Sequence, residues 1–274
     1  MKTHAVSGAA GVRLHVCESG NPRGTPLLFI HGWAQSHLCW VRQLESALAD
    51  EFRLAAFDLR GHGMSEVPAG ADAYSGDAFA QDLAAVLDAL ALERPILVGW
   101  SYAGFVICDY LEKYGGARLG GLDLVAAGAV LGPAAFGTLI GPGFLDHAPD
   151  ACADDLATRI AATRHFLRVC LPGVSSEDFE SSLAAMMLVA PAVRAALISR
   201  ELDGTAALSA FPAPVLVSHG RADTVVLPAM SDLVLASCPN ARASWYDGIG
   251  HAPFLEVPAR FNAELAAFAR SARA

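Results

Sequence analysis

Apolar positions along this chain follow the pattern of a mostly parallel sheet covered by helices. Five short runs are almost continuously apolar, as strands buried on both faces are: 26–32, 52–58, 95–101, 122–128 and 214–220. The run 12–18 alternates apolar and polar residues, which predicts an early, antiparallel strand. Stretch 244–247 is also strand-like. The sequence therefore predicts an α/β domain.

Helical segments separate these runs. Between the second and third run, apolar residues recur at the spacing of one buried helix face: Phe79, Leu83, Val86, Leu87 and Leu90. Segment 259–273 has the composition of a final helix that closes the chain.

The alternation of strand and helix breaks between Gly132 and Phe211. This stretch lacks a strand-like run, and segments 156–171 and 179–198 are both helical in period. We expect a helical cap at 132–210, inserted into a core domain formed by 1–131 and 211–274. The alternative is that these helices form a second core.

The composition is apolar enough for a membrane protein, because 54% of the residues are hydrophobic and only 17% are charged. The longest uncharged stretch, 124–145, contains five glycines together with Pro133 and Pro142, which would interrupt a spanning helix. The N-terminus has no apolar stretch of signal-peptide length. We therefore expect no membrane segment.

Charge and cysteine content exclude further classes of partner and cofactor. A net charge of −9 without a basic run argues against nucleic acid. The six cysteines form no C-x-x-C pair, so neither a zinc site nor a redox pair is indicated. We expect no metal, no cofactor and a reducing, cytoplasmic setting.

Ser101 has the surroundings of a nucleophile. It ends the apolar run 95–101 and precedes a helical segment, and the small residues Gly99 and Ala103 flank it at two positions on either side. A tight strand-to-helix turn of this kind holds a serine hydroxyl clear of its backbone. The usual pattern is G-x-S-x-G, and here Ala103 takes the last position, with Gly104 next. An ordinary helix cap would also explain a serine at this place.

A serine hydroxyl needs a base and a group that orients the base. His251 lies in a glycine-rich loop after 244–247, and Asp223 lies in the turn after 214–220. Alone, His251 could be a surface histidine and Asp223 a turn residue. Their order, serine then aspartate then histidine, is the one expected for this architecture, and each follows its own strand. We predict that Ser101, Asp223 and His251 are catalytic.

The turn after the first buried run provides a place for a developing oxyanion. The sequence His31, Gly32, Trp33 can direct the backbone N–H of Trp33 at the site, and the N–H of Tyr102 would be the second donor. We expect His31 to hold this loop by hydrogen bonds rather than to act as a second base.

Together these segments resemble the α/β-hydrolase family over nearly the whole chain. Segment 58–65 matches the family's D-x-R-G-x-G-x-S turn through Asp58, Arg60, Gly61, Gly63 and Ser65. The resemblance implies an eight-stranded sheet, a cap after the sixth strand, and a structural turn in which Asp58 and His62 have no catalytic role. The His-Gly-Trp turn is most similar to the esterase and cofactor-free haloperoxidase (perhydrolase) branch.

The resemblance also implies a mechanism. Ser101 would attack an acyl carbonyl, so the substrate would be a small-molecule carboxylic ester with a largely apolar acyl group. A serine at this position excludes the family's haloalkane dehalogenase and epoxide hydrolase chemistry, which requires a carboxylate nucleophile. Lactones, carbon–carbon bonds beside a carbonyl, thioesters and perhydrolysis remain alternatives, as does a slow-turnover receptor. A hydroxynitrile lyase would need a polar group near the serine, and Lys113 is the nearest lysine in sequence.

Apolar side chains of the cap and of the site loops are candidates for the pocket wall. Besides Trp33 and Tyr102, the predicted wall consists of Trp100, Phe136, Met186, Met187 and Phe254. For the residues in the cap, packing within the cap is the alternative role.

Overall fold

The computed structural model describes residues 1–273. Its centre is an eight-stranded sheet in the order β1-β2-β4-β3-β5-β6-β9-β10. The strands are β1 Lys2–Ser7, β2 Arg13–Gly20, β3 Pro26–Ile30, β4 Arg53–Phe57, β5 Ile96–Trp100, β6 Gly121–Val125, β9 Val215–Gly220 and β10 Ala241–Tyr246. β2 pairs antiparallel with β1 and β4, and all other pairs are parallel. The predicted mostly parallel, eight-stranded α/β fold is confirmed.

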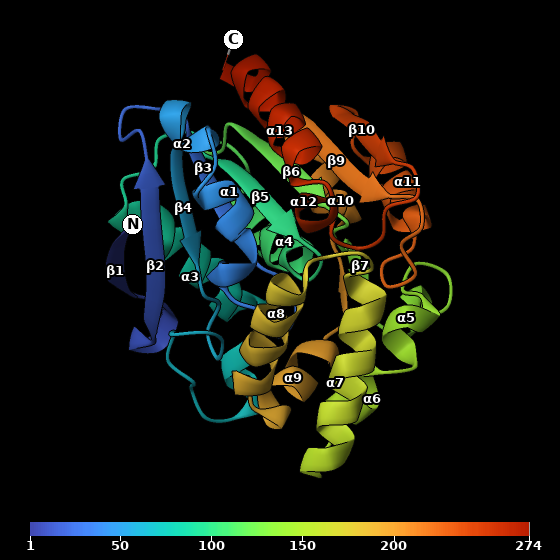
Figure 1. The fold of residues 1–274 in the computed structure, drawn as a ribbon. Helices are drawn as coiled ribbons and strands as arrows, with labels where there is room; N and C mark the ends of the chain where they lie inside the picture. Colours follow the sequence, from blue (N-terminus) through green and yellow to red (C-terminus); the bar gives the residue numbers. More distant parts are fainter. Residues whose placement is uncertain (274) are drawn as a thin grey trace.

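Helices cover the sheet on both faces (Figure 1). The core helices are α1 Val41–Leu44, α2 Leu48–Glu51, α3 Gly76–Ala89, α4 Ala103–Tyr114, α10 Thr205–Ser209, α11 Pro228–Ser237, α12 Pro253–Glu256 and α13 Pro258–Arg273. Short 3-10 turns are η1 Ala9–Gly11, η2 His37–Trp40, η3 Ala71–Tyr74 and η4 Pro133–Ala135. Strands β3, β5 and β6 are almost entirely buried, which explains their continuous apolar runs.

Six α-helices lie between β6 and β9. The first five form what we call the helical insertion: α5 Pro142–Leu145, α6 Ala148–Ala151, α7 Leu156–Cys170, α8 Ser176–Leu188 and α9 Pro191–Ile198. Figure 1 shows α7, α8 and α9 side by side at one end of the sheet. The expectation that 132–210 contains no strand is wrong in one detail. β8 Leu202–Asp203 pairs antiparallel with β7 Val130–Leu131, and two residues are too short to give a periodic signal.

The predicted boundary at residue 210 places α10 in the cap, but α10 packs against the core helices α4 and α11. The separate status of the cap stays a prediction. Among the described residues no single helix is long and apolar enough to cross a membrane. The pair α8 and α9 reaches the required length and composition only together, and the two helices are bent by 91°.

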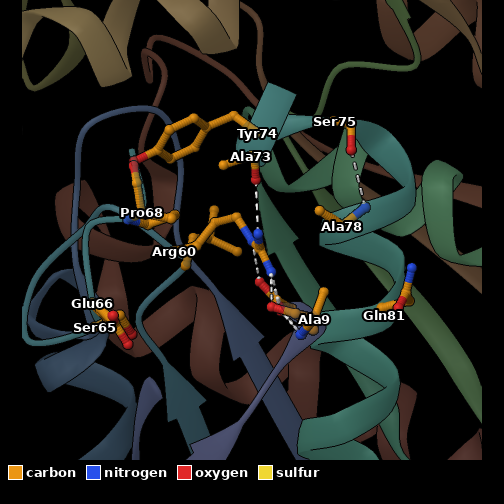
Figure 2. A network of polar contacts seen from close by, with 12 residues as sticks. Ala9, Arg60, Ser65, Glu66, Pro68, Ala73, Tyr74, Ser75, Ala78 and Gln81 are labelled. Atoms are coloured by element: carbon orange, nitrogen blue, oxygen red, sulfur yellow. Dashed lines mark hydrogen bonds and ion pairs between the residues drawn. The ribbon is translucent and has the colours of Figure 1, made fainter. Parts of the chain in front are cut away.

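The turn after β4 is tied to its neighbours by a buried arginine. Figure 2 shows Arg60 at the centre of this network. Its guanidinium donates to both carboxylate oxygens of Asp82 at 2.6 Å, to the carbonyl of Ala73 at 2.7 Å and to that of Ala9 at 3.2 Å. Because Asp82 lies on α3, Arg60 joins the turn, α3 and the β1–β2 connection. These bonds account for Arg60 structurally.

Candidate active site

Ser101 lies directly after β5, in a backbone conformation that side chains rarely adopt. Its φ is +56°, a strained region that persists where the surroundings enforce it. The Ser101 N–H donates to the Val125 carbonyl of β6 at 3.0 Å, and the Ser101 carbonyl accepts from Gly104 and Gly128 at 3.0 Å each. The turn therefore holds the hydroxyl at the carboxyl end of the central strands.

Small neighbours make this turn possible. A Cβ on Gly104 would lie 2.2 Å from the Gly128 carbonyl oxygen, so position 104 has no room for a side chain. A Cβ on Gly99 would lie 3.3 Å from the Cβ of Ala103. Ala103 can therefore replace the usual glycine because Gly99 leaves it space.

The three predicted catalytic residues form one chain of hydrogen bonds. His251 Nε2 lies 2.9 Å from the Oγ of Ser101, and His251 Nδ1 lies 2.7 Å from Oδ2 of Asp223. A carboxylate only accepts, so Nδ1 carries the proton and Nε2 is free to accept the proton of the serine hydroxyl. Both His251 and Asp223 are buried.

Asp223 accepts three further hydrogen bonds, two from its own turn and one from His219 at the end of β9. Its Oδ1 accepts from the N–H groups of Val225 at 2.8 Å and Val226 at 3.2 Å, and its Oδ2 lies 3.0 Å from Nε2 of His219. Burial alone would raise the pKa of Asp223, but His251 and His219 together hold this pKa below its usual value. The ionised carboxylate can therefore orient His251 and stabilise its protonated form.

The loop that carries His251 is fixed by two residues that sequence reasoning did not assign to it. Glu256 accepts from the N–H groups of Gly250 at 3.1 Å and Ala252 at 3.3 Å. The indole N–H of Trp100 donates to the His251 carbonyl at 2.9 Å. These hydrogen bonds fix the backbone at Gly250, His251 and Ala252.

The backbone N–H groups of Trp33 and Tyr102 are the candidate donors to an oxyanion. Trp33 follows the His-Gly turn after β3, and Tyr102 follows Ser101 at the start of α4. Within residues 1–273, neither N–H donates to a protein acceptor, although both residues are buried. Buried N–H groups are almost always paired, so these two donors are suited to a ligand oxygen.

His31 has the structural role expected for it. Its Nε2 accepts from the N–H of Leu59 at 3.0 Å, and its Nδ1 donates to the carbonyl of Gly32 at 2.8 Å. Burial lowers the pKa of His31 to about 4, so the ring is neutral at physiological pH. It holds the loop that carries Trp33.

Asp58 and His62 also lie in structural positions. Asp58 accepts from Met64 and from both the backbone and the ring of His37. In the described part of the chain, His15, His37 and Asp58 form a cluster whose ligand atoms lie within 4.8 Å of one another. Since both oxygens of Asp58 already accept hydrogen bonds, we assign this cluster no metal.

A small cavity lies over the serine hydroxyl. Its volume is about 30 Å³, which is enough to hold a water molecule. Besides Ser101, the lining is Trp33, Tyr102, Phe105, Leu131, Ile140, Phe144, Ile198, Val225 and Val226. The walls are therefore apolar, and three of them, Ile140, Phe144 and Ile198, come from residues 132–210.

This lining differs from the pocket wall predicted from sequence. Trp33 and Tyr102 line the cavity, but none of the five other predicted wall residues does. Phe254 packs against Trp40 and Trp100, with ring centroids 4.1 and 5.0 Å apart. Phe136 is 40% exposed. Met186 is buried within the insertion and Met187 is half-buried on α8.

Lys113 lies away from Ser101. Its ammonium group pairs with Asp77 of α3 at the surface, so nothing in its position supports lyase chemistry at the serine.

The fold defines the class of protein to which this chain belongs. The family model described as alpha/beta hydrolase fold matches residues 25–258, and the chain belongs to this family.

Two solved esterase structures are similar to this chain over 99% of both chains. The esterase RhEst1 from Rhodococcus sp. ECU1013 is 36% identical, with a TM-score of 0.93. A putative aryl esterase from Burkholderia cenocepacia is also 36% identical, with a TM-score of 0.92. A 2-hydroxymuconate semialdehyde hydrolase from Pseudomonas sp. (strain CF600) is 31% identical over 92% of this chain and 89% of its own length.

Proposed function

We propose that this protein is a serine esterase that cleaves small to medium, largely apolar carboxylic esters. The observation that carries the proposal is the continuous chain from the Ser101 hydroxyl through His251 to Asp223, with contacts of 2.9 and 2.7 Å. The more general activity, that of a hydrolase acting on small molecules, follows from the family.

In the first step, Ser101 Oγ attacks the acyl carbonyl carbon while His251 Nε2 accepts the hydroxyl proton. Asp223 stabilises the imidazolium that forms. The carbonyl oxygen becomes an oxyanion and accepts hydrogen bonds from the N–H groups of Trp33 and Tyr102. The tetrahedral intermediate then expels the alcohol, which receives the proton from His251, and leaves an acyl group on Ser101.

In the second step, a water molecule attacks the acyl-enzyme. His251 accepts a proton from this water, the same two N–H groups stabilise the second oxyanion, and the acid leaves as Ser101 regains its proton. The three side chains and two backbone N–H groups named here are sufficient for both steps.

The apolar lining favours an uncharged acyl group, because the cavity offers no charged side chain to pair with a carboxylate or an ammonium. Similarity to two esterases at 36% identity supports the same substrate class. The cavity is far smaller than an ordinary ligand pocket of roughly 300–1,000 Å³. We infer that the helical insertion moves to admit the substrate, as a cap would.

The same residues could serve other acyl chemistry. A lactone, a carbon–carbon bond beside a carbonyl, or perhydrolysis would use the same nucleophile and the same oxyanion donors. Among these alternatives, carbon–carbon cleavage has the support of the 31% identical semialdehyde hydrolase. A receptor would bind its ligand at this site and release little product.

The six cysteines support a reducing compartment. All six are free thiols, and five of them are buried. We infer a cytoplasmic setting from this.

Steady-state hydrolysis of p-nitrophenyl esters from acetate to decanoate tests the proposal. We expect turnover with an optimum at short to medium chains, and a loss of at least ~10³-fold in kcat for Ser101→Ala. Ser199→Ala, an exposed serine after α9, is the matched control and should keep full activity. Equal rates in Ser101→Ala and wild type would contradict the proposal. Absence of ester turnover, with activity on a lactone or a carbon–carbon substrate, would move the assignment to that alternative.

A further inference from the structure

The side chain of Trp33 is bound to the helical insertion. Its indole N–H donates to the carbonyl of Arg194 on α9 at 3.1 Å. The indole ring also packs edge-on against Phe144 and Phe166 of the insertion, with ring centroids 5.4 and 5.5 Å apart. The residue that offers one oxyanion donor through its backbone is thus anchored to α9 through its side chain.

The side chain of Tyr102 is bound to the same helix. Its hydroxyl donates to the carbonyl of Leu197 at 3.2 Å and accepts from the guanidinium of Arg200 at 3.0 Å. Arg200 also pairs with both oxygens of Asp109 on α4, at 2.6 and 2.7 Å. Burial raises the pKa of Tyr102 to about 12, so its hydroxyl keeps the proton that it donates.

The two accepting carbonyls belong to one rigid element. Arg194 and Leu197 are three residues apart on α9, so their positions lie on the same side of the helix. The buried Arg194 side chain fixes α9 within the insertion, because it donates to the carbonyls of Ala151, Met186 and Val189 and to the hydroxyl of Thr163. One helix therefore contacts both candidate oxyanion residues at once.

We propose that α9 positions the oxyanion donors, through the bonds from the Trp33 indole to the Arg194 carbonyl and from the Tyr102 hydroxyl to the Leu197 carbonyl. This inference rests on the proposed serine-hydrolase function. In this arrangement the side chains of Trp33 and Tyr102 are positioning groups, and their backbone N–H groups are the catalytic ones. Movement of α9 away from the core breaks both bonds, so the oxyanion site is complete only while the insertion is docked.

Tyr102→Phe is the sharpest test, because it removes one hydroxyl and leaves the backbone N–H and the ring in place. We expect kcat for a p-nitrophenyl ester to fall ~10-fold while KM stays within about 2-fold. The loss is smaller than the ~10²–10³-fold that follows removal of a whole oxyanion donor. The matched control is Tyr110→Phe, a buried tyrosine on α4 that is not among the residues lining the cavity.

A second readout separates positioning from general packing. A trifluoromethyl ketone forms a tetrahedral adduct with a reactive serine, and the adduct's oxyanion needs the same two N–H groups. We expect Tyr102→Phe to lose affinity for this ketone by the same factor as kcat/KM. A purely structural role for the hydroxyl would lower the melting temperature and leave both the ketone affinity and kcat at wild-type values.

The Trp33 bond is tested independently with Trp33→Phe, which keeps an aromatic ring and removes the indole N–H. Trp40→Phe is its control, since the buried indole N–H of Trp40 has no hydrogen-bond partner among the described residues. If Tyr102→Phe folds poorly, Trp33→Phe and Trp40→Phe still test the inference. We expect a ~10-fold loss in kcat and in ketone affinity for Trp33→Phe only.

The outcomes separate the inference about α9 from the esterase proposal. If the wild type hydrolyses esters but both variants keep its kcat and ketone affinity, the inference about α9 is overturned and the esterase proposal stands. If the wild type neither hydrolyses esters nor binds the ketone, both fall together.

Discussion

The ring of His219 donates a hydrogen bond to Asp223. Its Nε2 lies 3.0 Å from Oδ2, the oxygen that also accepts from His251, and 2.9 Å from the carbonyl of Val226. Since both neighbours of Nε2 are acceptors, the proton of this buried ring lies on Nε2. The other ring nitrogen, Nδ1, can then accept from the hydroxyl of Ser231. Asp223 is therefore shared between two histidines, of which only one contacts the serine.

This sharing predicts an effect on the pH dependence of activity. In His219→Phe the carboxylate of Asp223 loses one donor and holds the protonated form of His251 more strongly. We expect the acid limb of the kcat/KM profile to move to higher pH. His219→Gln, whose amide can still donate, should stay close to the wild-type profile. An unchanged acid limb in His219→Phe, measured on folded protein, would show that His219 does not act through Asp223.

We expect Arg194 to stabilise the fold although it has no carboxylate partner. Its guanidinium is buried and donates only to carbonyls and one hydroxyl, and burial lowers the pKa of Arg194 to about 10, so it stays charged at neutral pH. Arg194→Met leaves those carbonyls unpaired, at a cost of about 1–3 kcal/mol for each buried group. We expect the free energy of unfolding in urea to fall by at least about 2 kcal/mol. Arg164→Met, an exposed arginine on α7, should change it little, and equal stability of the two variants would refute this role.

Because of Asp123, we expect the stability of the protein to depend on pH. It is fully buried on β6, its Oδ1 accepts from the Ser218 hydroxyl at 2.8 Å, and its Oδ2 has no partner among the described residues. Burial is the main cause that raises the pKa of Asp123; Glu264 adds to the rise, Ser218 and Arg242 oppose it, and the net change is from 3.8 to about 7. The folded chain therefore keeps a proton that the unfolded chain loses, and stability falls as pH rises from about 4 to about 7.

Asp123→Asn removes this titration and keeps the group neutral. We expect the variant to gain stability relative to the wild type as pH rises from 4 to 8, by an amount on the order of a few kcal/mol. Urea unfolding at several pH values measures the difference. Asp232→Asn, an exposed position on α11, is the control. Parallel stability profiles for the wild type and Asp123→Asn would contradict a protonated Asp123.

Most of the fold could be predicted from the sequence because buried parallel strands are continuous apolar runs. β1 was missed, since KTHAVS contains few apolar residues and has one buried position, Val6. That strand depends on its antiparallel pairing with β2, which is a tertiary contact. β7 and β8 were missed because strands of two residues have no period.

The candidate catalytic residues could be predicted because each follows its own strand in a recognisable turn. The pocket wall could not, because a helical period identifies a buried face but not what that face is buried against. The Met186 carbonyl accepts a hydrogen bond from Arg194, and Phe254 packs against Trp40. Two of the lining residues, Ile140 and Val226, lie outside the helices and strands, in segments without a periodic signal. For His219 the only signal was its place at the end of the strand that precedes Asp223.

Covalent labelling of Ser101 tests the central claim most directly. A fluorophosphonate reacts with a serine only where a base activates the hydroxyl and donors stabilise the oxyanion. We predict that mass spectrometry of the digested protein finds one adduct, on the peptide that contains Ser101, and that His251→Ala slows its formation by at least ~10²-fold. No adduct on folded wild-type protein, or labelling that is equally fast without His251, would contradict a nucleophilic Ser101 activated by His251.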